Sequence, residues 1–419
     1  MSPAPLIAAI DDPLTLRHGS AQALADALAD ARARSLGLFD AFEALLPRGL
    51  EVPYHDDINP PRWELGHVTW FEESWIARNP LRGRWRAAGP DTARGTSCLP
   101  KADALFDSSH VAHARRWHLE LPNAQHTRHY ARQVRERTLA LLHAAGRDGS
   151  DDDDDAYYFF RLVLAHEDMH AEAATYTMQH LALPVTQALR ACAPAAQRLV
   201  GELEVPGGAF TLGSAQAGFA FDNELGAHDA ELAPFEIDRA PVPWGRFLPF
   251  VEAGGYDDKR WWSDAGWTWR RKHSPGWPRY LRRDTDAGWQ RASFGEWLAL
   301  DLALPAMHLT QHEAMAWCAF TGRRLPSEAE WECAATTLSN TDECFEWGQV
   351  WEWTASAFVP YPGFTPHPYR DYSAPWFDGR PVLRGASFAT APRLKHARFR
   401  NYFPAERNDI FAGFRSCAI

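Results

Sequence analysis

The chain has 419 residues, of which 46% are hydrophobic and 13% aromatic, so it is long enough for two domains with apolar cores. A formal net charge of −11 argues against a nucleic-acid surface, which needs a clustered basic footprint, and against anionic membranes. No segment approaches the ~20 apolar residues of a membrane span, and the N-terminus lacks the basic and apolar regions of a signal peptide, so we expect a cytoplasmic protein.

Apolar residues recur at spacings of three and four up to about residue 190, which predicts helices. We expect them over 20–46, from Asn59-Pro60-Pro61 through Trp75, over 127–145 and over 156–182. Gly146 is expected to end the third helix, and the fourth stops before Pro184. Four such helices indicate an antiparallel bundle, and the long segment between the second and third is a candidate lid or substrate loop.

The pattern changes after about Arg198. Short strands are expected at 204–205, 209–212, 235–237 and 382–384, and short helices near 243–253, 311–321 and 328–336. Two of these helices begin with capping boxes, Thr310 with Glu313 and Ser327 with Glu330. The sequence therefore predicts an α+β protein of two domains: a helical bundle over 1–197 and an irregular α+β domain over 198–419.

The histidines His166 and His170 are the strongest chemical feature of the sequence. Their i, i+4 spacing places them on one helix face, about 6 Å apart along the axis. That face is otherwise apolar, so both rings point into the bundle, where unpartnered ring nitrogens are costly. His67, in a helix with Trp63 and Phe71, offers a third nitrogen from a facing helix. We predict a three-histidine metal site, and the spacing does not choose among Zn, Fe, Cu and Ni.

Two other interpretations of these histidines remain open. The segment from His166 to His170 also matches the H-E-x-x-H pattern of zinc metalloproteases, with Glu167 as general base, although no further histidine follows at the extended spacing. In a non-catalytic binding module, the same histidines would be hydrogen-bonded core residues.

Several segments resemble one enzyme family. Residues 59–67 (NPPRWELGH) and 166–172 (HEDMHAE) resemble the metal-ligand segments of the ergothioneine sulfoxide synthases. Residues 322–332, 350–354, 383–388 and 411–415 resemble the formylglycine-generating-enzyme-like domain of that family. The resemblance implies a DinB-like four-helix bundle followed by a C-type-lectin-like domain. It also implies a non-heme Fe(II) oxidoreductase with His67, His166 and His170 as ligands, acting on hercynine (N-trimethylhistidine) with O2.

A narrower resemblance concerns the second substrate. Residues 103–113 and 360–376 resemble the selenoneine synthase branch, which joins a selenosugar of the 1-selenoglucose type to C2 of hercynine, leading to selenoneine. Met169 stands where the sulfur enzymes often have Gln, and Tyr402 and Phe403 follow Asn401 where those enzymes often have an acidic residue. These departures favour a changed donor. The alternative is an ergothioneine-type sulfoxide synthase that uses cysteine or γ-glutamylcysteine.

A formylglycine-generating oxidase is a further alternative, because its domain is present. That chemistry uses a close pair of cysteines. The six cysteines form no CxxC pair, which is typical of reduced thiols in a cytosol, and Cys417 has no obvious partner in the sequence.

The resemblance also implies roles around the metal. A tyrosine is expected to supply a proton there, with the choice open among Tyr361, Tyr369, Tyr372 and Tyr402. A trimethylammonium group cannot donate a hydrogen bond, so aromatic faces are expected to hold it. Candidate substrate-binding residues are Met169, Trp353, Trp376, Asn401, Tyr402 and Phe403, with Arg115 and Arg116 near the donor-carboxylate position of the sulfur enzymes. Glu172 is expected to hydrogen-bond a ligand histidine.

Overall fold

The computed structural model describes residues 10–46, 49–148, 154–184, 193–196, 200–215, 218–338 and 344–419. The start of the segment considered for a signal peptide, and Cys192, lie outside these residues. The other cysteines are free thiols. None of the helices in the described residues combines the length and apolarity that a membrane span needs.

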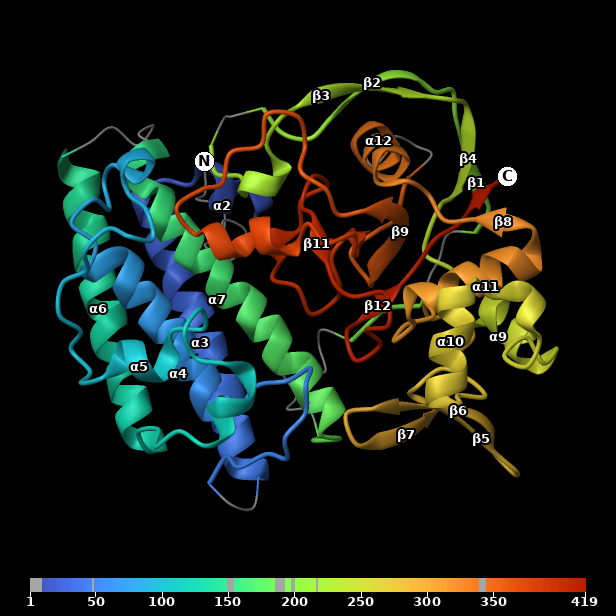
Figure 1. The fold of residues 1–419 in the computed structure, drawn as a ribbon, viewed down its shortest axis with the longest axis horizontal. Helices are drawn as coiled ribbons and strands as arrows, with labels where there is room; N and C mark the ends of the chain where they lie inside the picture. The colour runs from blue at the N-terminus through green and yellow to red at the C-terminus, as the bar shows by residue number, and fades with distance from the viewer. Residues whose placement is uncertain are drawn as a thin grey trace, which may run out of the picture.

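Four long helices build the N-terminal half: α3 (Ala21–Leu45), α4 (Pro61–Glu72), α6 (Ala124–Asp148) and α7 (Asp154–His180) (Figure 1). They lie where the apolar periodicity predicts them. Ser20 caps α3 by accepting from the amide of Ala23, and α4 begins at a proline and continues into a π-helical turn, η1 (Glu73–Ala77). Helix α3 packs against α6 and α7, and α4 packs against the same two helices. A short helix, α2 (Pro13–His18), precedes them.

The prediction that Gly146 ends the third helix is wrong, since α6 continues to Asp148. A Cβ atom at Gly146 would lie 2.8 Å from the Cβ of Ala21 at the start of α3. The glycine therefore allows two helices to approach closely, and its role is packing rather than termination.

The segment between α4 and α6 is fixed against α4. It contains η2 (Trp85–Ala87), α5 (Ala102–Phe106) and η3 (His113–Trp117). Arg78 donates two hydrogen bonds of 2.8 Å to Asp103, and the indole of Trp70 donates to the same carboxylate at 2.6 Å. Between α5 and η3 of the same segment, Ser109 donates to Asp371 of the C-terminal half. The segment thus connects the bundle to the second half of the chain.

The C-terminal half contains small sheets and short helices. One sheet has the order β1 (Glu202–Val205), β4 (Phe235–Asp238), β13 (Cys417–Ala418), β8 (Arg323–Arg324), and another has the order β11 (Asn401–Tyr402), β10 (Pro381–Arg384), β9 (Trp351–Ala357), β12 (Ala412–Gly413). All pairs are antiparallel except β12 with β9. Two further sheets are β2 (Gly208–Leu212) with β3 (His228–Leu232), and β5 (Leu281–Asp284), β6 (Gly288–Ser293), β7 (Glu296–Ala299).

The predicted short helices correspond to α9 (Trp244–Glu252), α11 (Gln311–Thr321) and α12 (Glu328–Leu338). Both capping boxes are confirmed, since in each the Ser or Thr accepts from the Glu amide and the Glu accepts in return. The sequence did not predict α10 (Asp264–His273) or the sheet β5–β7. Every residue of β7 is exposed, so that strand lacks the alternation by which strands are recognised. The 3-10 turns of this half are η4 (Asp222–Glu224), η5 (Lys259–Trp261), η6 (Arg370–Tyr372), η7 (Ala374–Trp376) and η8 (Pro392–Leu394).

Charged residues of the formylglycine-generating-enzyme-like segments, together with Arg400, are buried inside the C-terminal half. Buried ion pairs join Arg384 with Glu332, Arg400 with Glu328 and Arg415 with Glu352. A buried charge without its partner is costly, so these pairs explain the residue types without a catalytic role.

Helix α7 runs along the boundary between the two halves (Figure 1). From it, Asp168 accepts two hydrogen bonds from Arg393, at 2.6 and 2.8 Å, and both side chains are buried. Glu172 accepts from Trp351, Ser387 and Thr390 of the C-terminal half. The helix that carries two of the predicted metal ligands therefore also contacts the C-terminal half through buried hydrogen bonds.

Candidate metal centre

The structure brings the three predicted histidines together. His67 comes from α4, and His166 and His170 from α7. One ring nitrogen from each lies within 4.8 Å of the other two, and the Nε2 atoms of His166 and His170 are 3.1 Å apart. His67 and His166 are buried, and His170 is partly exposed toward a cavity.

The hydrogen bonds of these rings fit a bound cation. His67 Nδ1 lies 2.8 Å from the carbonyl of Phe106, and His170 Nδ1 lies 2.5 Å from a Glu64 carboxylate oxygen. Oxygen atoms of these kinds accept, so each Nδ1 carries the proton and each Nε2 presents a lone pair. If His166 carried a proton on Nε2, it could donate to only one of the two lone pairs on His67 and His170. A metal ion between the three rings would accept a lone pair from each ring. Burial lowers the pKa of His67 to about 3 and that of His166 well below its usual value, which keeps both rings in the neutral, ligating form.

Neighbouring residues hold the rings in place. Trp63 stacks on His67 with ring centroids 4.7 Å apart and planes 7° apart, and Phe71 stacks on His166 at 3.7 Å and 6°. Gly66 leaves room for the Phe106 ring, since a Cβ there would lie 2.2 Å from that ring. The residues just before His67 thus orient the metal site as well as forming the helix.

The partner of a ligand histidine is Glu64 rather than Glu172. The carboxylate of Glu172 accepts from Trp351 Nε1 at 2.8 Å, Ser387 Oγ at 2.6 Å and Thr390 Oγ1 at 2.7 Å, and no hydrogen bond joins it to a ligand histidine. The sequence did contain a signal for Glu64, which lies three residues before His67 and so shares its helix face.

We expect Glu64→Gln to weaken metal binding, because the carboxylate holds His170 in the tautomer that presents Nε2. Loss of such a partner typically costs about 10–100-fold in metal affinity. Glu172→Gln is the matched control, since it removes the same charge from a nearby carboxylate that does not contact a ligand histidine. Competitive Fe(II) titration against a chelator measures both. Equal losses in the two variants would contradict the role of Glu64.

The placement of Glu167 argues against the zinc-protease interpretation. Its carboxylate accepts from Arg32 Nε at 2.7 Å and also pairs with Arg135 inside the bundle. The two arginines lower the pKa of Glu167 to about 2 against the opposing effect of burial. A carboxylate engaged in this way is not a general base beside the metal.

A cavity of about 280 Å³ opens beside His166 and His170. Of the predicted substrate-site residues, it is lined by Met169, Glu172, Tyr369, Tyr372, Trp376, Asn401, Tyr402 and Phe403. Tyr176, Trp351 and Asp371 also line it, and no motif of the sequence had pointed to a site role for these three residues. No lysine or arginine is among its lining residues.

Four predicted residues lie outside this cavity. Trp353 is fully buried, and its indole donates to the carbonyl of Leu309 at 2.7 Å. Tyr361 packs beneath the Arg400 guanidinium, 3.9 Å from the ring centroid, so it belongs to the domain core. Arg115 is exposed on η3.

Arg116, the fourth, contacts residues next to the ligand His67 and does not line the cavity. It donates to Asn59 at 2.7 Å, and its guanidinium lies 3.9 Å from the ring centroid of Trp63, the residue that stacks on His67. Sequence position placed Arg116 near the site, but the direction of its side chain depends on the packing of the segment between α4 and α6.

The three predicted tyrosines at the cavity, Tyr369, Tyr372 and Tyr402, are all protonated at neutral pH, because burial raises the pKa of each. Tyr369 lies edge-on to His166, with ring centroids 6.2 Å apart. The Tyr372 hydroxyl is 3.7 Å from the Met169 sulfur, and Tyr402 lies 6.2 Å from Tyr372 between ring centroids. Each is therefore a phenol that can donate a proton into the cavity.

The chain is similar to known proteins over most of its length. Residues 189–349 match the FGE-sulfatase family, a sulfatase-modifying factor enzyme 1-like domain. The hercynine oxygenase of Mycolicibacterium smegmatis is 32% identical over 443 aligned residues, which cover 94% of this chain and 98% of that one. The chain belongs to the hercynine oxygenase family. The hercynine oxygenase of Mycobacterium tuberculosis is 31% identical, with the same coverage.

A more distant member of the comparison is ergothioneine biosynthesis protein 1 of Schizosaccharomyces pombe, 25% identical over 47% of this chain and 27% of that protein. Membership in the hercynine oxygenase family confirms the predicted family and the FGE-like domain. The DinB-like character of the bundle, the exact domain boundary and the selenoneine branch stay predictions.

Proposed function

We propose that this protein is an Fe(II)- and O2-dependent oxidoreductase that joins a selenosugar of the 1-selenoglucose type to C2 of hercynine, on a route to selenoneine. The observation that carries the proposal is the cavity beside His166 and His170, which is rich in aromatic side chains and has no lysine or arginine among the described residues that line it. The names of the full-length relatives support hercynine as the common substrate.

The metal is proposed to be held by His67, His166 and His170. Bound Fe(II) would supply open coordination positions for O2 and the substrates, which is the chemistry of non-heme iron oxygenases. The chain supplies the rest: two stacked rings orient the ligands, and the phenols of Tyr369, Tyr372 and Tyr402 hold protons at their Oη atoms beside the cavity.

Hercynine carries a fixed cation that forms no hydrogen bond, and its best partners are aromatic faces and negative charge. Trp376, Tyr402 and Phe403 offer such faces in the cavity, and Asp371 adds a carboxylate. We propose that these residues hold the trimethylammonium group while the imidazole lies toward Met169 and the ligand histidines.

The charge of the cavity favours a sugar as donor. Cysteine and γ-glutamylcysteine carry carboxylates, for which binding sites normally provide arginine or lysine. This cavity instead presents Asn401, whose side-chain amide can bond sugar hydroxyls, and Arg116 is engaged with Asn59 and Trp63 outside it. The alternative function, an ergothioneine-type sulfoxide synthase, would need basic residues outside this cavity to bind the carboxylates of its donor.

The proposed reaction balances without a further reagent. The C2–H bond of hercynine and the Se–H bond of the donor break, and a C2–Se bond forms. One oxygen atom of O2 ends on selenium, and the other leaves as water with the two hydrogens. Cleavage of the resulting glycosyl selenoxide, in a later step, would release a selenenic acid, which a thiol reductant would reduce to selenoneine with loss of water.

The test is a donor panel. Protein loaded anaerobically with Fe(II) is mixed with hercynine and 1-selenoglucose, cysteine or γ-glutamylcysteine, then exposed to air and analysed by mass spectrometry. We expect the selenosugar to give the coupled product with at least about tenfold higher kcat/KM than either thiol, which corresponds to about 1.4 kcal/mol of transition-state discrimination. Sulfoxide formed only from the thiols would overturn the donor assignment and support the alternative function.

A further inference from the structure

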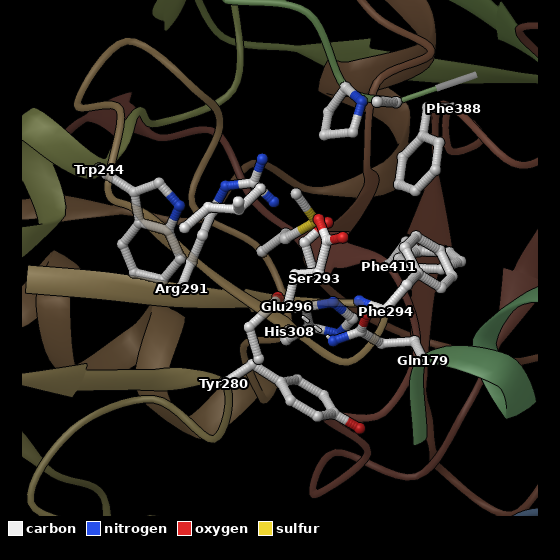
Figure 2. A pocket seen from close by; sticks show the side chains of 15 residues that line it. Gln179, Trp244, Tyr280, Arg291, Ser293, Phe294, Glu296, His308, Phe388 and Phe411 are labelled. Carbon is white, nitrogen blue, oxygen red and sulfur yellow. Dashed lines mark hydrogen bonds between the residues drawn. The ribbon is translucent and has the colours of Figure 1, made fainter. Parts of the chain in front are cut away.

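A second cavity, of about 180 Å³, lies where the end of α7 meets the sheet β5–β7 (Figure 2). None of the three predicted ligand histidines lines it. Gln179 of α7 forms part of its wall, accepting from the Phe294 amide at 2.6 Å and donating to the Ala292 carbonyl at 3.3 Å. Apolar side chains make up much of the remaining lining, including Met307 and Phe411.

Several polar atoms at this cavity lack partners. Trp244 and His308 are only 2% and 5% exposed, yet Trp244 Nε1 and His308 Nδ1 have no hydrogen-bond partner within the described ranges. The buried Nε of Arg291 is likewise without a hydrogen-bond partner among the described residues, and the Asp301 carboxylate acts on its guanidinium only through its charge. A buried donor left unsatisfied costs about 1–3 kcal/mol, so the two unpartnered N–H groups of Trp244 and Arg291 at one cavity indicate a missing occupant.

The directions in which these side chains point indicate the chemical class of the ligand. In Figure 2 the indole nitrogen of Trp244 and the guanidinium of Arg291 point into the same side of the cavity, and the rings of Phe294 and Phe411 lie on the opposite side. An N–H donor next to a cation is the arrangement that binds a carboxylate. The aromatic rings across from it suit an apolar body.

The volume of the cavity limits the apolar part of the ligand to about one six-membered ring. An apolar protein cavity of about 150 Å³ holds benzene. A cavity of about 180 Å³ therefore accommodates a six-membered ring with one small substituent. Glu296 also lines the cavity, but its side chain is exposed, so solvent screens its charge from a carboxylate bound at Arg291.

We propose that this cavity is a second small-molecule site, which binds a ring-sized carboxylate with its carboxyl group on Arg291 and Trp244 and its apolar body against Phe294 and Phe411. The site does not depend on the metal centre, since none of its lining residues is a ligand histidine. Because Gln179 forms its wall on α7, an occupant would contact the helix that carries His166 and His170.

Benzoate is the probe, titrated calorimetrically into metal-free, full-length protein, with benzyl alcohol and benzylamine as neutral and cationic analogues of the same size. We expect benzoate to bind and the two analogues to bind at least tenfold more weakly. Arg291→Gln is expected to weaken benzoate at least tenfold. Arg283→Gln is the matched control, because Arg283 is an exposed arginine of the same sheet and lies outside the cavity.

Trp244→Phe separates a ligand contact from a structural role. It removes the unpartnered N–H together with part of the buried indole ring, so we expect a somewhat lower melting temperature of the ligand-free protein, and a several-fold loss of benzoate affinity that exceeds the loss for benzyl alcohol. The proposal is overturned if benzoate at 10 mM, a concentration at least about tenfold above a useful Kd for such a ligand, does not bind. It is also overturned if Arg291→Gln and Trp244→Phe leave benzoate affinity unchanged. Either result leaves the donor panel at the histidine cavity unaffected, so the two proposals fail independently.

Discussion

His166→Ala is expected to abolish metal binding and activity. The substitution removes one of three converging nitrogens and the ring on which Phe71 stacks. Because loss of a hydrogen-bond partner of a ligand alone costs about 10–100-fold in metal affinity, loss of the ligand itself should exceed about 100-fold. Metal content by mass spectrometry and turnover of hercynine with each donor measure the effect.

The variant is expected to fold, which makes the loss interpretable. His166 Nδ1 is buried without a partner among the described residues, so alanine removes an unsatisfied polar atom at the cost of a small cavity. His143→Ala, at an exposed position on α6, is the control for removing a histidine. If neither the wild-type protein nor His166→Ala retained a transition metal, and both were equally stable, a core-histidine role would be the better interpretation.

Asp168→Ala is expected to have the largest effect on stability. Asp168 and Arg393 form a buried bidentate pair between α7 and the C-terminal half, and truncating the acid leaves the guanidinium without its buried partner. Breaking such a pair typically costs about 3–5 kcal/mol. Urea-induced unfolding of the purified protein, followed by intrinsic tryptophan fluorescence, gives the change.

Asp30 provides a matched control, because it pairs with the same arginine, Arg393. The two side chains are 2.8 Å apart, but that of Asp30 is 49% exposed, so Asp30→Ala should cost less than about 1 kcal/mol. A double variant, Asp168→Leu with Arg393→Met, replaces the pair by apolar side chains and should recover much of the loss. Equal effects of Asp168→Ala and Asp30→Ala would show that the interdomain pair contributes nothing beyond a surface contact.

The sequence determined what depends on spacing within one element. The positions of the four long helices and the shared face of His166 and His170 follow from helical periodicity, which fixes neighbours three and four residues apart whatever surrounds them. The capping boxes at Thr310 and Ser327 are local for the same reason. Burial of polar nitrogens on an apolar face then predicts that His67 joins the pair, and the structure brings the three together.

Only the tertiary structure decided which side chains from different elements meet. Glu64 rather than Glu172 holds a ligand histidine, and Tyr361 lies in the domain core while Tyr369 lines the cavity. The polar groups around the second cavity, on segments far apart in the chain, carry no mutual spacing that a sequence pattern could reveal. These outcomes depend on how irregular segments of the C-terminal half pack against α7. Such segments have no period, so the direction of each side chain is set by the contacts that it makes after folding.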